Sequence, residues 1–142
     1  MKNSEQAKLI QEFSAISSWE QRYQKIIALG KALKPLPEEF KKPDLLVKGC
    51  QSQVWLKADL DAAGHVHFLA DSDALIVKGL IALLLRVYSG LTPQEILETQ
   101  PNFIAELGFE GNLSPSRANG LQAMIKQIKY YALAYQSLLA TR

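Results

Sequence analysis

Residues 74–88 are apolar on nearly every side, and this stretch limits the folds that the chain can adopt. A helix without a polar face is usually enclosed by other elements. We therefore predict a central helix over these residues, with Gly79 marking a close neighbour. The preceding residues 71–73, Asp-Ser-Asp, favour the start of that helix, because acidic residues there complement the helix macrodipole.

Two runs of alternating apolar and polar residues precede this helix. Residues 54–60 and 66–70 both show the period of two that is typical of half-buried strands. Residues 61–64, Asp-Ala-Ala-Gly, predict a turn between them, so the two runs are expected to pair as an antiparallel hairpin. Residues 45–48 are expected to form a third, short strand.

Further helices are predicted on both sides of the strands. One covers residues 5–13. The next opens with a capping box of Ser17 and Glu20 and ends before Pro35, because proline restricts the residue before it and lacks an amide proton. The remaining helices are expected to open at residues 92–93, 101 and 114–115.

Helices on either side of centrally clustered strands predict an α+β fold. We expect one domain over residues 1–142, built from a small three-stranded antiparallel sheet with helices packed on one face. The chain has no βαβ alternation and no glycine-rich phosphate loop, which argues against a nucleotide-binding sheet.

Composition excludes several classes of protein. The net charge is only +2 and no basic cluster strengthens it, which argues against a nucleic-acid partner. The longest apolar run, residues 80–85, is far shorter than the roughly 20 residues of a membrane span. The N-terminal residues carry no apolar signal core. A single cysteine excludes an intramolecular disulfide and fits a reducing compartment, so we expect a cytoplasmic protein.

The single cysteine, Cys50, is the leading candidate for chemistry. Free cysteine is among the most buried residue types, which is the plain structural interpretation. However, its neighbours are Gly49, Gln51 and Ser52, which are poor core residues and suit presentation on a loop. Lys48 is close enough in sequence to favour the thiolate, the reactive form. Local sequence leaves a structural and a reactive cysteine equally open.

His65 and His67 share one face of the second predicted strand. With Cys50 they would form a Cys-His-His metal site, or one of them would be the base of a cysteine-dependent hydrolase. The spacing is not diagnostic, and histidines on the outer face of a strand are more often simply solvated.

Arg117 lies in the first turn of the last predicted helix, where a positive charge opposes the macrodipole. Gly120 in the same helix costs about 1 kcal/mol relative to alanine, which suggests a close backbone contact. We expect residues 114–120 to pack beside the Cys50 loop, with Arg117 supporting the loop or the thiolate. The plain alternative is a surface arginine that points away.

Two further residues are candidates for contact with a partner. Asp73 is either an ordinary helix-start acid, a partner of Arg117 or part of a docking face. Trp55 is expected on the outward face of its strand, where an exposed aromatic ring would anchor a protein contact.

Four stretches together resemble the SufE family of sulfur acceptors in iron–sulfur cluster assembly. Residues 47–55, Val-Lys-Gly-Cys-Gln-Ser-Gln-Val-Trp, resemble the family's cysteine motif, and the Gln-Ser after the cysteine is closer to SufE than to CsdE. The other similar stretches are residues 19–30, residues 71–82 with Asp-Ser-Asp-Ala and Ile-Val-Lys-Gly-Leu-Ile-Ala, and residues 113–121 with Leu-Ser-Pro-Ser-Arg and Asn-Gly-Leu.

The resemblance implies a fold similar to the IscU-type scaffolds and a sulfur carrier that is not itself an enzyme. Cys50 would take sulfane sulfur, as a persulfide, from a PLP-dependent cysteine desulfurase of the SufS type, stimulate that desulfurase, and pass the sulfur to the SufBCD scaffold. Gly49, Gln51 and Arg117 would support the loop, whereas Asp73 and Trp55 would dock the partner. The resemblance implies no metal and no cofactor of its own, since PLP belongs to the desulfurase, and a weak homodimer.

Overall fold

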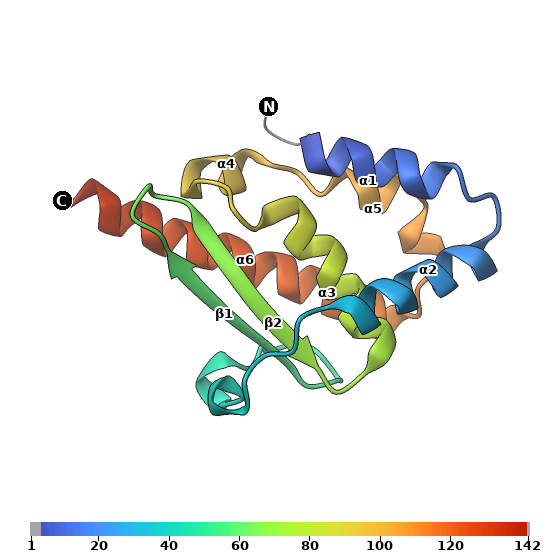
Figure 1. Cartoon of the computed structure of the whole chain (residues 1–142), viewed down its shortest axis with the longest axis horizontal. Helices are drawn as coiled ribbons and strands as arrows, with labels where there is room; N and C mark the ends of the chain where they lie inside the picture. Colours follow the sequence, from blue (N-terminus) through green and yellow to red (C-terminus); the bar gives the residue numbers. More distant parts are fainter. Residues whose placement is uncertain (1–3, 142) are drawn as a thin grey trace.

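The computed structural model describes residues 4–141 and is built around one β-hairpin. Strand β1 (Val54–Leu60) pairs antiparallel with β2 (Val66–Ser72), from Val54 opposite Ser72 to Leu60 opposite Val66 (Figure 1). The alternating apolar side chains of both strands, among them Val54, Leu56, Val66 and Phe68, are buried on the same face. The predicted hairpin is therefore confirmed.

The predicted third strand is wrong within the described residues. Pro43–Leu45 forms a 3₁₀ turn, and only one isolated bridge, Leu46 with Trp55, joins this region to β1. Proline limits pairing at one end because it lacks an amide donor. At the other end, the edge of β1 is already occupied: the tyrosine hydroxyls of Tyr131 and Tyr135 donate to the carbonyls of Leu56 and Ala58, at 3.3 and 3.0 Å.

Helix α3 (Leu75–Tyr88) is central, as predicted (Figure 1). It packs between α2 (Trp19–Ala32), β2 and the long α6 (Pro115–Ala140). A β-carbon on Gly30 would lie 2.7 Å from the Gly79 amide nitrogen, and one on Gly79 would collide with the Ile26 carbonyl. The predicted close neighbour of Gly79 is therefore α2, and a pair of glycines lets the two helices touch backbone to backbone.

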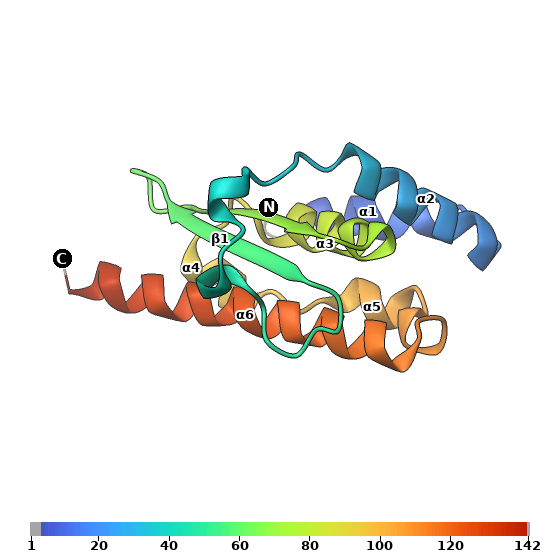
Figure 2. The ribbon, with the colours of Figure 1, turned by 90° about the horizontal axis from the view of Figure 1, so that it is seen from below.

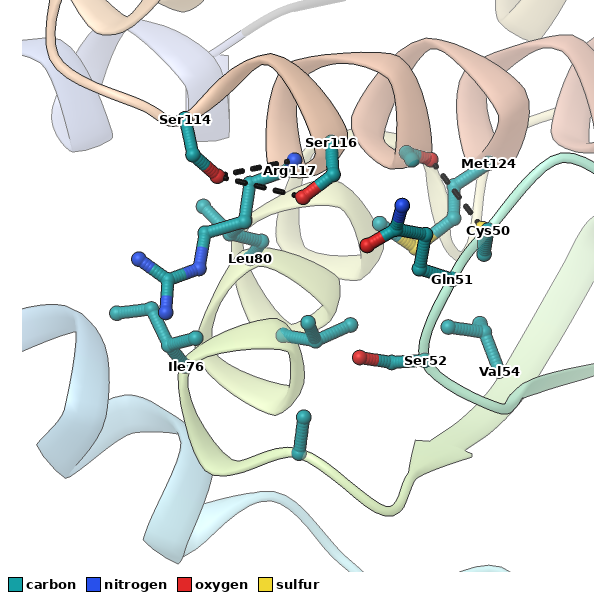
Figure 3. Close-up of a pocket in the computed structure, with 13 residues that line it drawn as sticks. Cys50, Gln51, Ser52, Val54, Ile76, Leu80, Ser114, Ser116, Arg117 and Met124 are labelled. Atoms are coloured by element: carbon teal, nitrogen blue, oxygen red, sulfur yellow. Dashed lines mark hydrogen bonds between the residues drawn. The ribbon is translucent and has the colours of Figure 1, made fainter.

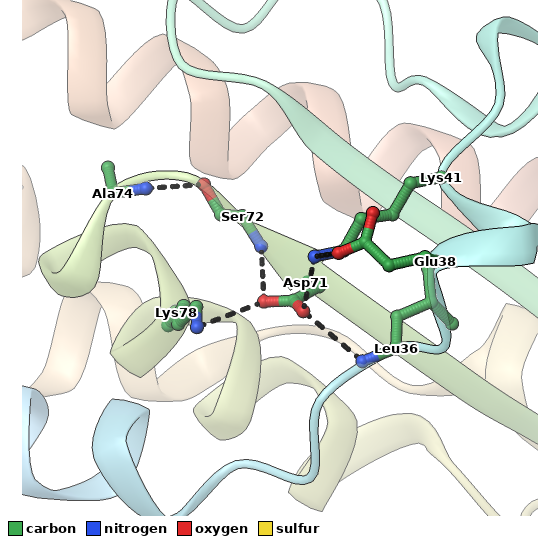
Figure 4. A network of polar contacts seen from close by, with 7 residues as sticks. All are labelled: Leu36, Glu38, Lys41, Asp71, Ser72, Ala74 and Lys78. Carbon is green, nitrogen blue, oxygen red and sulfur yellow. Dashed lines mark hydrogen bonds and ion pairs between the residues drawn. The ribbon is translucent and has the colours of Figure 1, made fainter.

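The predicted helix start at residues 71–73 is wrong, because β2 continues to Ser72 and the N-cap position of α3 is Ala74. Asp71 is only 2% exposed. Its carboxylate accepts from the amides of Leu36 and Ser72, at 3.2 and 2.8 Å, and pairs with Lys78 and Lys41 (Figure 4).

Asp71 is thus a buried carboxylate that links the end of β2 to the distant loop at Leu36, and it is not a helix-start acid. Burial raises the pKa of Asp71, but the hydrogen bonds from Ser72 and Leu36 and the nearby Lys78 lower it more, so the carboxyl lies below its ordinary range. A buried carboxylate needs several donors, and here a strand end and a distant loop supply them. The network ties the segment before the cysteine loop to the hairpin.

The other helices are short apart from α6, and their capping residues explain their positions. Ser18, not the predicted Ser17, caps α2 by accepting from the Gln21 amide at 3.1 Å. Thr92 and Glu95 form a capping box at the start of α4, where a helix was predicted to open. The remaining elements are α1 (Ser4–Ser14), α4 (Pro93–Glu98), α5 (Asn102–Glu106), and 3₁₀ turns at Glu38–Phe40 and Phe109–Gly111.

Figure 2 shows the resulting layers, with α6 on one side of α3 and α2 on the other. The α+β class is therefore confirmed, with two strands in place of three. The outer face of β1 is partly covered by the segment that carries the first two 3₁₀ turns. No helix within residues 4–141 combines the length and apolar character needed to cross a membrane.

Candidate functional site

The loop that holds Cys50 depends on a glycine. Gly49 has φ +95°, in the region that side chains strongly disfavour. A β-carbon there would also lie 3.3 Å from the β-carbon of Ala123 on α6. The Gly49-Cys50 sequence thus lets the loop turn sharply while lying directly on the helix.

Cys50 is half-buried between its loop and α6. Its thiol donates a long hydrogen bond to the Gly120 carbonyl, with sulfur and oxygen 3.6 Å apart. A β-carbon built on Gly120 would lie 3.7 Å from that sulfur, which is an ordinary van der Waals distance. The thiol therefore lies against the helix at a residue that has no side chain. The close contact expected at Gly120 is therefore present, and its neighbour is the cysteine itself.

Burial raises the pKa of the Cys50 thiol above its ordinary value. This direction is opposite to the activation expected from Lys48, which is exposed and is not among the causes of the shift. Because the thiolate is the nucleophilic form, the cysteine is held in its less reactive state in this conformation.

The thiol borders a cavity of about 320 Å³ (Figure 3). A water molecule occupies roughly 30 Å³ in the liquid, so this space is many times the size of one added atom. The floor is apolar and the rim is polar. The floor consists of Val54, Ala74, Ile76, Val77, Leu80 and Met124, and the rim of Gln51, Ser52, Ser114, Ser116 and Arg117.

The start of α6 lies beside the cysteine loop, in the position expected for residues 114–120. Ser114 caps the helix by accepting from the Arg117 amide at 3.3 Å. The Arg117 side chain lines the cavity and is exposed, and none of the ion pairs among the described residues includes it (Figure 3). It makes no hydrogen bond to Cys50 there, so its expected support of the thiolate stays a prediction.

Asp73 clamps the base of the cysteine loop, a contact that the sequence did not indicate. Its carboxylate accepts from the Gln53 amide at 3.0 Å, and its own amide donates to the Gln53 carbonyl at 3.3 Å. No ion pair joins Asp73 to Arg117 within residues 4–141, so that predicted pairing is wrong. Asp73 is exposed, and its expected part in docking a partner stays a prediction.

Trp55 is not the exposed anchor that the strand pattern predicted. The residue is only 9% exposed. The Lys41 ammonium lies 5.6 Å from the ring centroid, and Leu46 bridges to the Trp55 backbone. The alternation correctly placed Trp55 on the outer face of β1, but a segment folded over that face covers it. Docking through Trp55 is therefore not available in this conformation.

The two histidines lie at the opposite end of the hairpin from Cys50. Seven strand residues separate the cysteine loop from the turn, a span of about 20 Å. His67 Nε2 contacts the Asp61 carboxylate at 2.7 Å, and His65 Nδ1 lies 3.9 Å from it. Neither imidazole can act as a base on the Cys50 thiol, so the hydrolase alternative is wrong.

The proposed Cys-His-His metal site is not assembled either. Within residues 4–141 no group of three His, Cys, Asp or Glu side chains is placed to hold a metal ion. His67 is exposed and His65 is partly exposed, close to the plainer interpretation of solvated histidines. The backbone hydrogen bond from His65 and the His67 side chain are the main causes that lower the pKa of Asp61 to about 2.

The apolar floor of the cavity is a part of the site that no local sequence pattern indicated. Ile76 and Leu80 on α3, and Gly120 and Met124 on α6, follow the spacing of four that places residues on one helix face. That spacing was visible in the sequence. It signalled core packing only, and nothing local showed that the two faces meet below Cys50.

Comparison with known proteins identifies the fold and the family of this chain. A solved structure with similar fold, the solution structure of a hypothetical protein from Thermus thermophilus, aligns with a TM-score of 0.78 and 23% sequence identity, covering 96% of this chain and 99% of that one. The family description SufE, the Fe-S metabolism associated domain, matches residues 7–132. With Cys50 on a glycine-turned loop inside the matched region, the chain belongs to the SufE family.

Proposed function

We propose that this protein accepts sulfane sulfur on Cys50 from a PLP-dependent cysteine desulfurase of the SufS type and delivers it to a SufBCD scaffold. Membership of the SufE family associates the chain with iron–sulfur metabolism. The observation that carries the proposal is the single thiol, placed on a loop at the mouth of a cavity whose floor is apolar.

The chemistry is a sulfur exchange that needs no outside oxidant. The Cys50 thiolate attacks the terminal sulfur of the persulfide on the partner's cysteine, as a thiolate attacks a disulfide. A sulfur–sulfur bond forms on Cys50 while the partner's sulfur–sulfur bond breaks. The partner's cysteine leaves as a thiolate, so charge and oxidation level are both conserved.

The environment of the thiol suits a carrier that reacts only with its partner. Burial raises the pKa of Cys50, so few thiolates form while the loop rests on α6. Lifting the loop from Gly120 would end that burial and restore the ordinary pKa. The apolar side chains of the cavity would contact a bound persulfide and reduce its exposure to water and competing thiols.

Intact-mass analysis tests the proposal directly. The native chain, incubated with a desulfurase and cysteine, should gain about 32 Da, one sulfur atom, and the gain should disappear after reduction. Cys50→Ser is the matched control: it should keep the fold and the partner's binding but gain no mass. If Cys50→Ser stimulated sulfide release by the desulfurase as strongly as the native chain, a relay through Cys50 would be wrong.

The proposal also covers where the protein acts, its use of cofactors, its preferred desulfurase and its oligomeric state. The protein acts in the cytoplasm, uses no cofactor of its own, and is a transfer protein and not an enzyme, because PLP resides in the desulfurase. A specific likeness to SufE over CsdE would appear as preferred stimulation of a SufS-type desulfurase. The weak homodimer is tested by sedimentation at several protein concentrations, where the mean mass should rise towards twice that of the chain.

A further inference from the structure

A second hollow borders the cysteine loop on the side away from the cavity. Its volume is about 480 Å³, larger than that of the cavity at the thiol. We call it the lysine groove. It is lined by Lys48 and Gly49 from the loop, and by Asn119, Gln122, Ala123, Lys126, Gln127 and Tyr130 from α6.

The loop separates the two hollows along α6. Cys50 and the residues after it line the cavity, whereas Lys48 and Gly49 line the lysine groove. Gly49 and Cys50 therefore form a ridge between the two hollows. Gly49 lies against Ala123 of α6 and Cys50 contacts Gly120, and these contacts hold the ridge on the helix. A molecule lying in the groove would therefore lie against the backbone of the residue next to the thiol.

Charge is one-sided around this ridge. Every charged side chain that the described residues contribute to either lining is basic: Lys48 and Lys126 in the groove, and Arg117 in the cavity. The nearby acid Asp73 lines neither, and its carboxylate already accepts from the Gln53 amide. None of the three basic side chains takes part in an ion pair among residues 4–141, so their charge is available to a partner.

We propose that the lysine groove receives an acidic segment of the cysteine desulfurase when that enzyme docks over Cys50; this inference rests on the proposed function. Complementary charge speeds the encounter and sets its orientation. Three amide side chains in the lining supply further donors for carboxylates. Tyr130, 66% exposed at the groove's end, offers an aromatic anchor of the kind that dominates protein contacts.

A second copy of this chain is the competing occupant. The exposed face of α6 continues past Tyr130 to Leu133 and Leu138, which would suit self-association. In a two-fold dimer both copies use the same patch, so the lysines of both grooves would lie within one interface. Like charges at an interface are unfavourable, and charge complementarity therefore favours an acidic partner over a second copy.

The test reverses the charge of the groove and measures binding to the purified desulfurase. Lys48→Glu with Lys126→Glu should raise the dissociation constant by at least about tenfold at low salt and remove most of its dependence on salt concentration. The matched control is Lys31→Glu with Lys34→Glu, which changes the net charge equally through two exposed lysines outside both linings. The control should bind within about twofold of the native chain.

Three further readouts keep the outcomes distinct. Alkylation of Cys50 by neutral iodoacetamide should be unchanged in Lys126→Glu, which shows that the loop is intact in a variant that alters only α6. If the native chain gains sulfur and the double reversal binds and loads as the native chain does, the groove proposal is wrong and sulfur acceptance stands.

If the native chain itself gains no sulfur mass with the desulfurase, the proposed function fails and the groove's assignment falls with it. If charge reversal alters only the sedimentation mass of the protein, the groove is a contact between copies, and the desulfurase assignment is overturned.

Discussion

The two ends of the β-hairpin carry similar residues and differ in what packs against them. At the Val54 end, a glycine with positive φ precedes Cys50 and lies against Ala123 of α6. At the other end, Gly64 also has positive φ, but a β-carbon there would meet nothing within 4 Å. One loop is supported by a helix and borders a cavity, whereas the other is an exposed turn.

Reactive residue types thus do not form a site unless the surrounding fold supports them. His65 and His67 are residue types that often take part in catalysis, yet among residues 4–141 the polar partner shown for their side chains is the exposed Asp61 carboxylate. Cys50 gains its character from Gly120, 70 residues away, and from a cavity that α3 and α6 help to line.

The largest expected effect is on sulfur loading, which should depend on the Cys50 end of the hairpin and not on the histidine end. Cys50→Ser should abolish the mass gain, because the accepting atom is gone. His65→Ala with His67→Ala should load fully and at the native rate, because the imidazoles lie about 20 Å away. Intact mass over time measures both. A loading defect in the histidine variant would mean that the turn end takes part after all.

Substituting the two loop glycines compares backbone strain alone, at Gly64, with backbone strain plus steric crowding, at Gly49. Gly64→Ala should lower the free energy of unfolding by about 1 kcal/mol through backbone strain alone. Gly49→Ala should cost about 2 kcal/mol, because crowding against Ala123 adds to the strain. Urea unfolding measures the cost. The Cys50 alkylation rate should rise only in Gly49→Ala, and equal rates in both variants would contradict support of the loop by α6.

Removing one acid at each end tests what holds the cysteine loop. Asp73→Ala frees the Gln53 amide, so Cys50 alkylation should become several-fold faster, with a stability loss of about 1 kcal/mol. Asp61→Ala removes the acceptor for the Ala63 and His65 amides and should leave Cys50 alkylation unchanged. If Asp73→Ala reacted at the native rate, the clamp would have no part in restraining the thiol.

The smallest effects are pH dependences of opposite sign at the two ends. The folded-state pKa of Cys50 is raised, so its stabilising contribution is complete below the unfolded thiol's pKa, about 8.5, and is lost as pH rises through the folded value. Asp61 has a lowered pKa of about 2, so its contribution is present above the unfolded pKa and is lost as pH falls through the folded value.

Unfolding measured across pH checks both signs. Cys50→Ser should flatten the alkaline slope and Asp61→Asn the acid slope. A native thiol that titrated below the thiol of the urea-unfolded chain would contradict burial as the dominant influence on Cys50.

Local sequence patterns predicted the elements but not what covers them. The alternation in residues 54–60 put Trp55 on the correct face, and the segment that holds Lys41 and Leu46 covers it there. The acidic residues before α3 predict a helix start, yet the Leu36 amide, 35 residues away, makes Asp71 a buried link between β2 and a distant loop. The third strand is predicted where hydroxyls of Tyr131 and Tyr135 occupy the edge of β1.

The amino-acid sequence alone was enough to predict the hairpin, the central helix and the helix start at residues 92–93, and to single out Cys50 as a candidate reactive residue. These features depend on periodicity and on neighbours within a few residues, which a linear pattern records. Only the folded structure shows that Cys50 is half-buried with a raised pKa, that Asp73 hydrogen-bonds the base of its loop, and that a basic groove lies beside it. The physical reason is distance along the chain: the Gly120 carbonyl that receives the thiol is 70 residues from Cys50, and only packing brings them together.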